Sequence, residues 1–231
     1  MNKIKPIHEA IATIPSGASI MIGGFGSPGT PFSLIDELIK QGQSGLTLIK
    51  NDANEAGVGI SKLIERGQVK KLITTHIGLN KIAIEKMNAG ELEVEFHPQG
   101  MLAEKIRTAG AGSFGFLTDI GLGTEITKTD QLIEWQGITY KMEMALKADF
   151  ALLHAAHADH FGNLIYEGSA MNFNPLMAMA ATHVIAESPA CHAAGELVPN
   201  QVHTPCAFVD QIVLLNTLTS EYEVMEHHVK H

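Results

Sequence analysis

The chain has 231 residues, 45% of them hydrophobic, and a formal net charge of −9 at pH 7. Such a chain can bury a sizeable core in one large domain or two small ones. The acidic balance and the lack of a basic cluster argue against nucleic acid, and against an anionic membrane surface, as the main partner.

The N-terminal residues show no apolar signal segment, and no run of residues is long and apolar enough to span a bilayer. Cys191 and Cys206 are the two cysteines, and their spacing does not match a metal site. We therefore expect a cytoplasmic protein with reduced thiols and no membrane partner.

A glycine-rich turn between a strand and a helix dominates the start of the chain. The apolar run 18–22 predicts a buried strand, and Gly23 begins the turn. Thr30 is the predicted N-cap and Pro31 the predicted first residue of a helix that ends near Gly42. Backbone N–H groups are free where a helix begins, so we expect this turn to hold an anion.

Strand-like and helix-like segments alternate in the first half of the chain. The predicted strands cover 18–22, 46–49, 71–75 and 92–96, and the predicted helices cover 7–14, 31–41, 60–64, 81–88 and 98–109. This alternation predicts an α/β fold with a largely parallel sheet flanked by helices. Ligands of such sheets bind beyond the carboxyl ends of the strands. We therefore expect four turns to converge there, at 23–30, 51–54, 75–78 and 98–100.

The pattern changes after residue 110. Residues 110–129 are rich in Gly and Thr without a clear helix, and 132–140 predicts a β-hairpin that turns at Gln136-Gly137. Further strands are predicted at 148–156, 182–186 and 208–215. The segment 171–181 predicts a helix, and we expect its three methionines, Met171, Met177 and Met179, to fill the core. Residues 1–231 thus form one expected α/β domain with an irregular, β-rich middle.

The glycine turn also matches a dinucleotide fingerprint. Gly24-Phe25-Gly26-Ser27-Pro28-Gly29 reads G-x-G-x-x-G, and Asp52 ends the next strand, where such folds place a ribose-binding acid. An NAD(P)-dependent oxidoreductase is therefore one alternative. Pro28 and a helix that starts after the third glycine weaken it, and a purely structural turn is the simpler interpretation.

Two other groups of residues lack a pattern typical of a metal site or a nucleophile. His154, His157 and His160 are spaced by three residues, which does not place their side chains on one strand face. We expect hydrogen-bonded or solvated histidines there and no metal. Glu55 and Glu167 lie near glycine turns, but nothing local marks either as a nucleophile. The sequence thus offers a binding and polarising surface without an evident nucleophile.

A set of separated motifs resembles, in the same order, the A (alpha) subunit of the family I coenzyme A transferases. The matching segments are Gly23-Gly24-Phe25 with Gly29 and Pro31, Lys50-Asn51-Asp52-Ala53, Gly78-Leu79-Asn80-Lys81, Pro98-Gln99-Gly100, Asn172-Phe173-Asn174-Pro175 and Thr204-Pro205. Because several motifs match over nearly the whole chain, this resemblance is more specific than one glycine loop.

The resemblance implies an enzyme that moves coenzyme A between an acyl-CoA and a 3-oxo or short-chain acid such as acetoacetate. It implies a glutamyl-CoA intermediate on a partner B (beta) subunit, which supplies the nucleophile, and a two-A, two-B heterotetramer. Coenzyme A and acyl-CoA are then substrates, and no cofactor is permanently bound. A non-catalytic binding subunit is a further alternative.

The resemblance also implies site residues. Gln99 is the implied oxyanion donor, and Asn51 and Asp52 lie in the implied acid-binding turn. The implied CoA contacts are Gly24, Phe25, Gly26, Ser27, Pro28, Gly29 and Thr30. The sequence departs from the family pattern at several positions, which leave the acid substrate open. Among them are Asp52 for asparagine, Asn54 for glycine, His76 for tyrosine, Met101 for threonine and Cys206 for glycine, together with Ser113-Phe114 and Asp119-Ile120.

Overall fold

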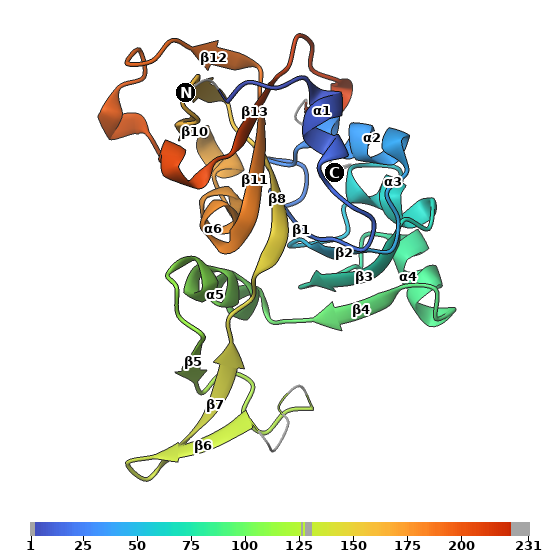
Figure 1. Ribbon diagram of the computed structural model, residues 1–231. Coiled ribbons are helices and arrows are strands. Elements are labelled where there is room, and N and C mark those ends of the chain that lie inside the picture. The colour runs from blue at the N-terminus through green and yellow to red at the C-terminus, as the bar shows by residue number, and fades with distance from the viewer. Residues whose placement is uncertain (1–2, 126, 128–130, 223–231) are drawn as a thin grey trace, which may run out of the picture.

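The computed structural model describes residues 3–125, 127 and 131–222. Its centre is a seven-stranded sheet with the strand order β13-β11-β8-β1-β2-β3-β4 (Figure 1). All pairings in this sheet are parallel. The strands are β1 (Ser19–Ile22), β2 (Leu46–Ile49), β3 (Val69–Thr74), β4 (Glu93–Phe96), β8 (Ala148–His154), β11 (Ala181–Ser188) and β13 (Gln211–Leu214). The predicted α/β fold with a largely parallel sheet is confirmed.

Helices cover both faces of this sheet. They are α1 (Ile7–Ala12), α2 (Phe32–Gln41), α3 (Ile60–Glu65), α4 (Lys81–Asn88), α5 (Gln99–Gly110) and α6 (Asn174–Ala180). One hydrophobic cluster joins α1–α4 to one sheet face through residues such as Ile20 and Ile22. A second cluster joins α5 and α6 to the other face through residues such as Met21. The central strands are mostly apolar because both of their faces are largely buried.

The predicted core helix at 171–181 is shorter than its sequence pattern. Helix α6 begins at Asn174, and only one of the three methionines is in the core. Met177 is fully buried, whereas Met171 and Met179 are each 41% exposed. The expectation of three core methionines was therefore wrong. Residues two apart on a helix point about 200° from each other, so Met177 and Met179 cannot share the buried face.

Two small sheets complete the fold. One joins β10 (Leu164–Ile165), β9 (His157–Asp159) and β12 (Ala190–His192), and the other joins β5 (Gly115–Thr118), β7 (Ile138–Met144) and β6 (Leu132–Trp135). Short 3-10 helices are η2 (Gly168–Ala170), η3 (Pro199–Gln201), η4 (Cys206–Phe208) and η5 (Ser220–Tyr222). The predicted hairpin is present between β6 and β7. Its turn residues Gln136 and Gly137 have φ values of 53° and 77°, as a two-residue hairpin turn requires.

The glycine-rich turn after β1 leads into α2 along a tight path. Gly29 has a φ of 78°, and a Cβ there would lie 2.4 Å from the carbonyl oxygen of Ala170. The predicted N-cap was wrong, because Pro31 occupies that position and α2 begins at Phe32. The hydroxyl of Thr30 instead donates to the carbonyl oxygen of Gly26 at 2.7 Å, which closes the turn on itself.

Gly29→Ala should destabilise the protein more than the matched variant Gly42→Ala. Gly42 ends α2 with a φ of 80° and has no atom within 4 Å of an added Cβ. Both variants incur the left-handed penalty of about 1–2 kcal/mol, but only Gly29→Ala adds a backbone overlap that costs about 1–3 kcal/mol more. Urea unfolding of both variants measures the difference. Equal losses would show that the turn yields without cost.

Candidate active site

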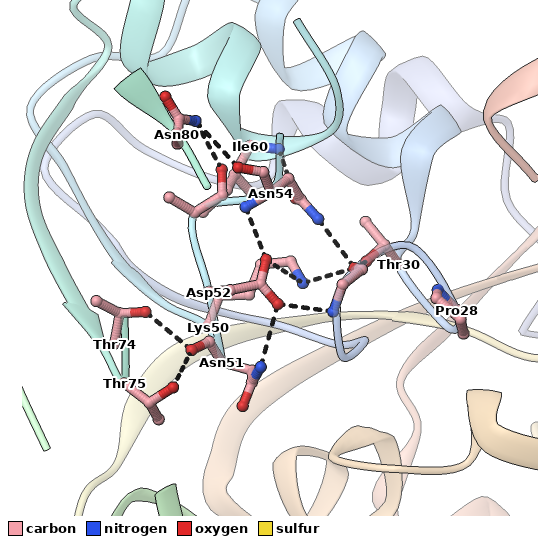
Figure 2. Close-up of polar contacts among 12 residues, drawn as sticks. Pro28, Thr30, Lys50, Asn51, Asp52, Asn54, Ile60, Thr74, Thr75 and Asn80 are labelled. Carbon is pink, nitrogen blue, oxygen red and sulfur yellow. Dashed lines mark hydrogen bonds and ion pairs between the residues drawn. The ribbon is translucent and has the colours of Figure 1, made fainter. Parts of the chain in front are cut away.

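The ends of three strands bring polar side chains together at one edge of the sheet, and Figure 2 shows those near the ends of β2 and β3. Asn51 follows β2, Thr75 follows β3, and Gln99 is the first residue of α5. The side-chain amide of Gln99 donates to Asn51 Oδ1, and Thr75 Oγ1 lies 3.1 Å from Gln99 Oε1. Asn51 is fully buried, whereas Gln99 is exposed. The predicted convergence of the turns is therefore present, and Gln99 is its accessible member.

The carboxylate of Asp52 is bound to the glycine turn. It accepts hydrogen bonds from the backbone N–H of Gly26 at 2.6 Å, the backbone N–H of Asn54 at 2.7 Å and Asn51 Nδ2 at 3.1 Å. Burial raises the pKa of the Asp52 carboxyl, but the Lys50 ammonium 3.9 Å away and these hydrogen bonds together hold that pKa below its usual value. Asp52 thus organises the turn from inside the protein.

The carbonyl oxygen of Gly26 faces a second group of side chains. Lys50 Nζ donates to it at 3.2 Å and Asn54 Nδ2 at 2.9 Å (Figure 2). Lys50 is fully buried, and burial lowers the pKa of its ammonium while the Asp52 carboxylate opposes that change. Asn54 has a φ of 55°, which asparagine tolerates better than most residues. This explains how asparagine replaces the family's glycine there. Sequence patterns did not reveal that Lys50 is buried.

The start of α2 already holds an anion from the protein itself. Glu187, at the end of β11, accepts from the backbone N–H of Leu34 at 2.9 Å and is fully buried. It also accepts from the Tyr222 hydroxyl at 2.5 Å and lies 2.8 Å from His154 Nδ1. Tyr222 in turn accepts from the backbone N–H of Ser33 at 2.7 Å. The expectation of free N–H groups at this helix start was therefore wrong, because the fold fills the position with Glu187.

The same geometry argues against the dinucleotide alternative. A dinucleotide needs the helix start for its pyrophosphate and the acid after the second strand for its ribose. Glu187 occupies the first position, and Asp52 is committed to Gly26 in the second. The G-x-G-x-x-G pattern is thus explained by backbone geometry, since Gly24, Gly26 and Gly29 all have positive φ.

A cleft of about 780 Å³ opens beside the glycine turn. Of the predicted site residues, the following line it: Phe25, Gly26, Ser27, Pro28, Gly29, Thr30 and Asp52. Gly24, Asn51 and Gln99 lie outside the lining. Four acidic residues are in the lining, and the described lining contains no Lys or Arg. Asp52 and Glu221 are paired with Lys50 and Lys62, whereas Glu55 and Glu167 have no Lys or Arg partner among the described residues. The walls are otherwise largely apolar, so the cleft suits an uncharged chain.

The three histidines of the 154–160 segment have different surroundings. His154 lies against Glu187, His157 Nδ1 lies 3.1 Å from His192 Nε2, and His160 is exposed. The described residues contain no group of three His, Cys, Asp or Glu side chains that could hold a metal ion. Nor is any helix in the described part of the chain long and apolar enough to cross a membrane.

Asp52→Asn should destabilise the protein by about 3 kcal/mol at pH 7, because it leaves the buried Lys50 ammonium without its counter-charge. The folded pKa of Asp52 is lowered, so its stabilisation is complete above the unfolded pKa and is lost as pH falls through the folded pKa. The variant's deficit should therefore shrink in acid, below about pH 4. Urea unfolding between pH 7 and pH 3, with exposed Asp119→Asn as control, tests this. A deficit independent of pH would contradict it.

Relatives with assigned activities match the chain over most of its length. The alpha chain of a probable coenzyme A transferase of Bacillus subtilis strain 168 is 45% identical over 90% of this chain and 91% of its own length. The alpha chain of the acetate CoA-transferase of Escherichia coli K12 is 42% identical, with 92% of this chain and 96% of its own length covered. The alpha chain of the acetoacetyl-CoA:acetate/butyrate CoA transferase of Clostridium acetobutylicum is 45% identical over 92% of this chain and 97% of its own length.

Solved structures share the fold. An acyl-CoA transferase of E. coli O157:H7 superposes with a TM-score of 0.84 at 24% identity, over 96% of this chain and 49% of that chain. Glutaconate coenzyme A-transferase of Acidaminococcus fermentans gives a TM-score of 0.79 at 21% identity, over 92% of this chain and 75% of that chain. The AibA/AibB decarboxylase gives a TM-score of 0.78 at 29% identity, over 93% of this chain and 84% of that chain. The last case shows that this fold alone does not fix the reaction.

The match to the family extends over the glycine turn, the strand ends and the C-terminal strands. The family model of the coenzyme A transferases covers residues 4–215. Together with the alpha chains above, it shows that this chain belongs to the coenzyme A transferase family.

Proposed function

We propose that this chain is the alpha-type (A) half of a heteromeric CoA-transferase that moves coenzyme A between an acyl-CoA and a 3-oxo or short-chain acid, with acetoacetate as the type. Three relatives that are 42–45% identical carry names with different acids, so identity does not choose among them. The lining of the cleft is the observation that favours one class of acid. The carboxylates of Glu55 and Glu167, which pair with no Lys or Arg of the described residues, and the absence of Lys or Arg from the described lining favour an uncharged acyl chain over a dicarboxylate.

The proposed chemistry places the nucleophile on the partner. A glutamate carboxylate of the beta chain attacks the thioester carbonyl, the thiolate of coenzyme A leaves, and an acyl-glutamyl anhydride forms. The thiolate then attacks the glutamyl carbonyl and releases the first acid, which leaves glutamyl-CoA for the second acid to reverse the sequence. Each attack builds negative charge on a carbonyl oxygen. Gln99 is the proposed donor to that oxygen, a contribution of about 3–4 kcal/mol when water is excluded.

The surroundings of Gln99 support this role. Asn51 and Thr75 fix its amide, and its second N–H has no acceptor among the described residues. Asn51 contributes to the acid site through Gln99, whereas Asp52 contributes by lining the cleft and shaping the turn. The backbone of the turn from Gly24 to Thr30 is the proposed contact for coenzyme A.

The proposed assembly follows from the same relatives. Their names describe them as alpha-type subunits, which implies a second kind of chain in each enzyme. We take residues 1–231 as one CoA-transferase domain in a two-A, two-B heterotetramer in the cytoplasm. Coenzyme A and acyl-CoA are its substrates, and it holds no permanent cofactor.

Gln99→Glu should lower kcat of the assembled enzyme by about 100- to 1,000-fold, since the change keeps the side-chain shape but removes the N–H donor. KM should change little, because the interaction is made in the transition state. Gln201→Glu, at an exposed position outside the cleft, is the matched control. Steady-state kinetics and size-exclusion chromatography on both variants separate catalysis from assembly. A kcat like that of the wild type would rule out Gln99 as the donor.

The enzyme should prefer monocarboxylates. We expect kcat/KM for acetoacetate or butyrate to exceed that for succinate by about tenfold or more, because the second carboxylate of succinate meets carboxylates and no cation in the cleft. Competing acids assayed against one acyl-CoA give the ratio directly. Glu55→Gln removes one of those charges and should narrow the preference. If kcat/KM for succinate equals kcat/KM for butyrate, the cleft does not bind the acid.

A further inference from the structure

The sheet formed by β5, β7 and β6, which we call the arm, has one wholly apolar face. In an antiparallel pair, residues directly opposite each other share a face, and neighbours along a strand alternate. The registers pair Trp135 with Ile138, Ile133 with Tyr140, and Leu117 with Met142. Together with Met144, these side chains take up every position of that face except Gly115. A sheet face that is solvated in the working protein would carry polar residues.

The opposite face of the arm is anchored to the body. Glu143 is buried and accepts from Lys105 Nζ of α5 at 2.8 Å and from Lys141 Nζ at 2.6 Å. The backbone N–H of Leu146 also bonds to the carbonyl oxygen of Lys105, at 3.0 Å. Burial raises the pKa of the Glu143 carboxyl, but the two ammonium groups hold that pKa below its usual value. The arm is therefore held on α5 by its polar face.

The apolar face is only partly covered by the described chain, since Ile133, Tyr140 and Met142 are half-buried and its other side chains are exposed. Trp135 is 62% exposed, Met144 58%, Ile138 54% and Leu117 42%. In Figure 1 the arm extends below α5, away from the seven-stranded sheet. Exposed Trp and Met side chains in one contiguous patch are typical of the core of a protein interface.

We propose that the apolar face of the arm is where the second, beta-type chain docks. This inference rests on the proposed function, because that function requires a partner to bring a carboxylate to Gln99. Helix α5 begins at Gln99, and its Lys105 holds the arm through Glu143. The arm is thus attached to the helix that begins at the proposed donor, so a partner on the arm is joined to the site through that one helix.

The choice of a beta chain over a second copy of this chain has a further support. The acyl-CoA transferase with the TM-score of 0.84 is about twice as long as the part that this chain matches. The same architecture there adjoins a comparable length of further polypeptide. A second copy of this chain would bring another donor to Gln99 but no family nucleophile.

Paired substitutions on the two faces of the arm test the proposal in the complete enzyme. Trp135→Lys with Ile138→Lys adds two positive charges to the apolar face, and Glu134→Gln with Thr139→Lys adds the same charge to the opposite face of the same strands. Binding to the beta chain is measured by sedimentation. The first pair should weaken binding by about 100-fold or more, since it removes the two exposed apolar contacts that flank the hairpin turn. The second pair should leave binding within about threefold.

Tryptophan provides a direct readout, because Trp135 is the single Trp of the sequence. With 5-fluorotryptophan in this chain alone, its one ¹⁹F resonance should shift when the beta chain is added and stay unchanged when this chain is concentrated by itself. If the Trp135 and Ile138 pair disturbs folding by circular dichroism, Met144→Lys at the base of the arm gives the same test.

The outcomes separate the two proposals. If the wild-type chains assemble and the face variants assemble equally well, the docking surface is wrong while the proposed function stands. If the ¹⁹F resonance shifts only with the concentration of this chain, a second copy covers the face and the proposal is overturned. If no complex with the beta chain forms at all, the proposed function fails together with the docking surface.

Discussion

The backbone N–H and carbonyl groups of Gly26 are held by side chains that follow the neighbouring strand β2. Asp52 accepts from its N–H, and Lys50 and Asn54 donate to its carbonyl oxygen. This arrangement fixes a glycine turn that lacks regular secondary structure, and it does so with a buried ion pair whose two charges depend on each other. The turn can therefore present its outer backbone to a ligand while its inner side is fully bonded. Gly26 itself lines the cleft. Asn51, which binds Gln99, donates to the same Asp52 carboxylate that holds Gly26.

In the proposed function, the chemistry of the site is divided between two chains. This chain offers an amide donor at the sheet edge and a cleft with apolar walls and carboxylates, whereas the family reaction needs a carboxylate that attacks a thioester. Acidic groups in the cleft would repel the phosphates of coenzyme A. Under the proposed function, the partner would therefore bind the nucleotide part of that substrate, and the uncharged part of the molecule would reach the cleft. The proposed shared site would also account for an exposed apolar arm on a chain that is otherwise ordinary in composition.

Patterns along the sequence predicted the parallel sheet because buried strands and amphipathic helices differ in period. The strand at 46–49 and the helix at 81–88 have the predicted bounds. The convergence of the polar turns followed from the rule for strand ends. The hairpin at Gln136-Gly137 followed from its turn residues. Each of these features depends on local sequence and on rules common to all α/β folds.

Contacts between residues far apart in the chain could not be predicted from sequence patterns. Glu187 caps a helix that begins 155 residues earlier in the chain (187 minus 32), and no local pattern marks it. The burial of Lys50 depends on Gly26, which only the packed strands bring near. The role of Gln99 came from resemblance to a family, because an exposed glutamine at a helix start has no distinctive pattern of its own. Sequence periodicity also overestimated how many methionines α6 could bury.

The central claim is that the active site is complete only when two different chains meet. A titration tests it most directly: this chain is held at fixed concentration, the beta chain is added stepwise, and acetoacetate-dependent transfer of coenzyme A is measured. The account predicts no activity from either chain alone and a rise in activity that ends at equimolar beta chain. Full activity of this chain without the beta chain would contradict it.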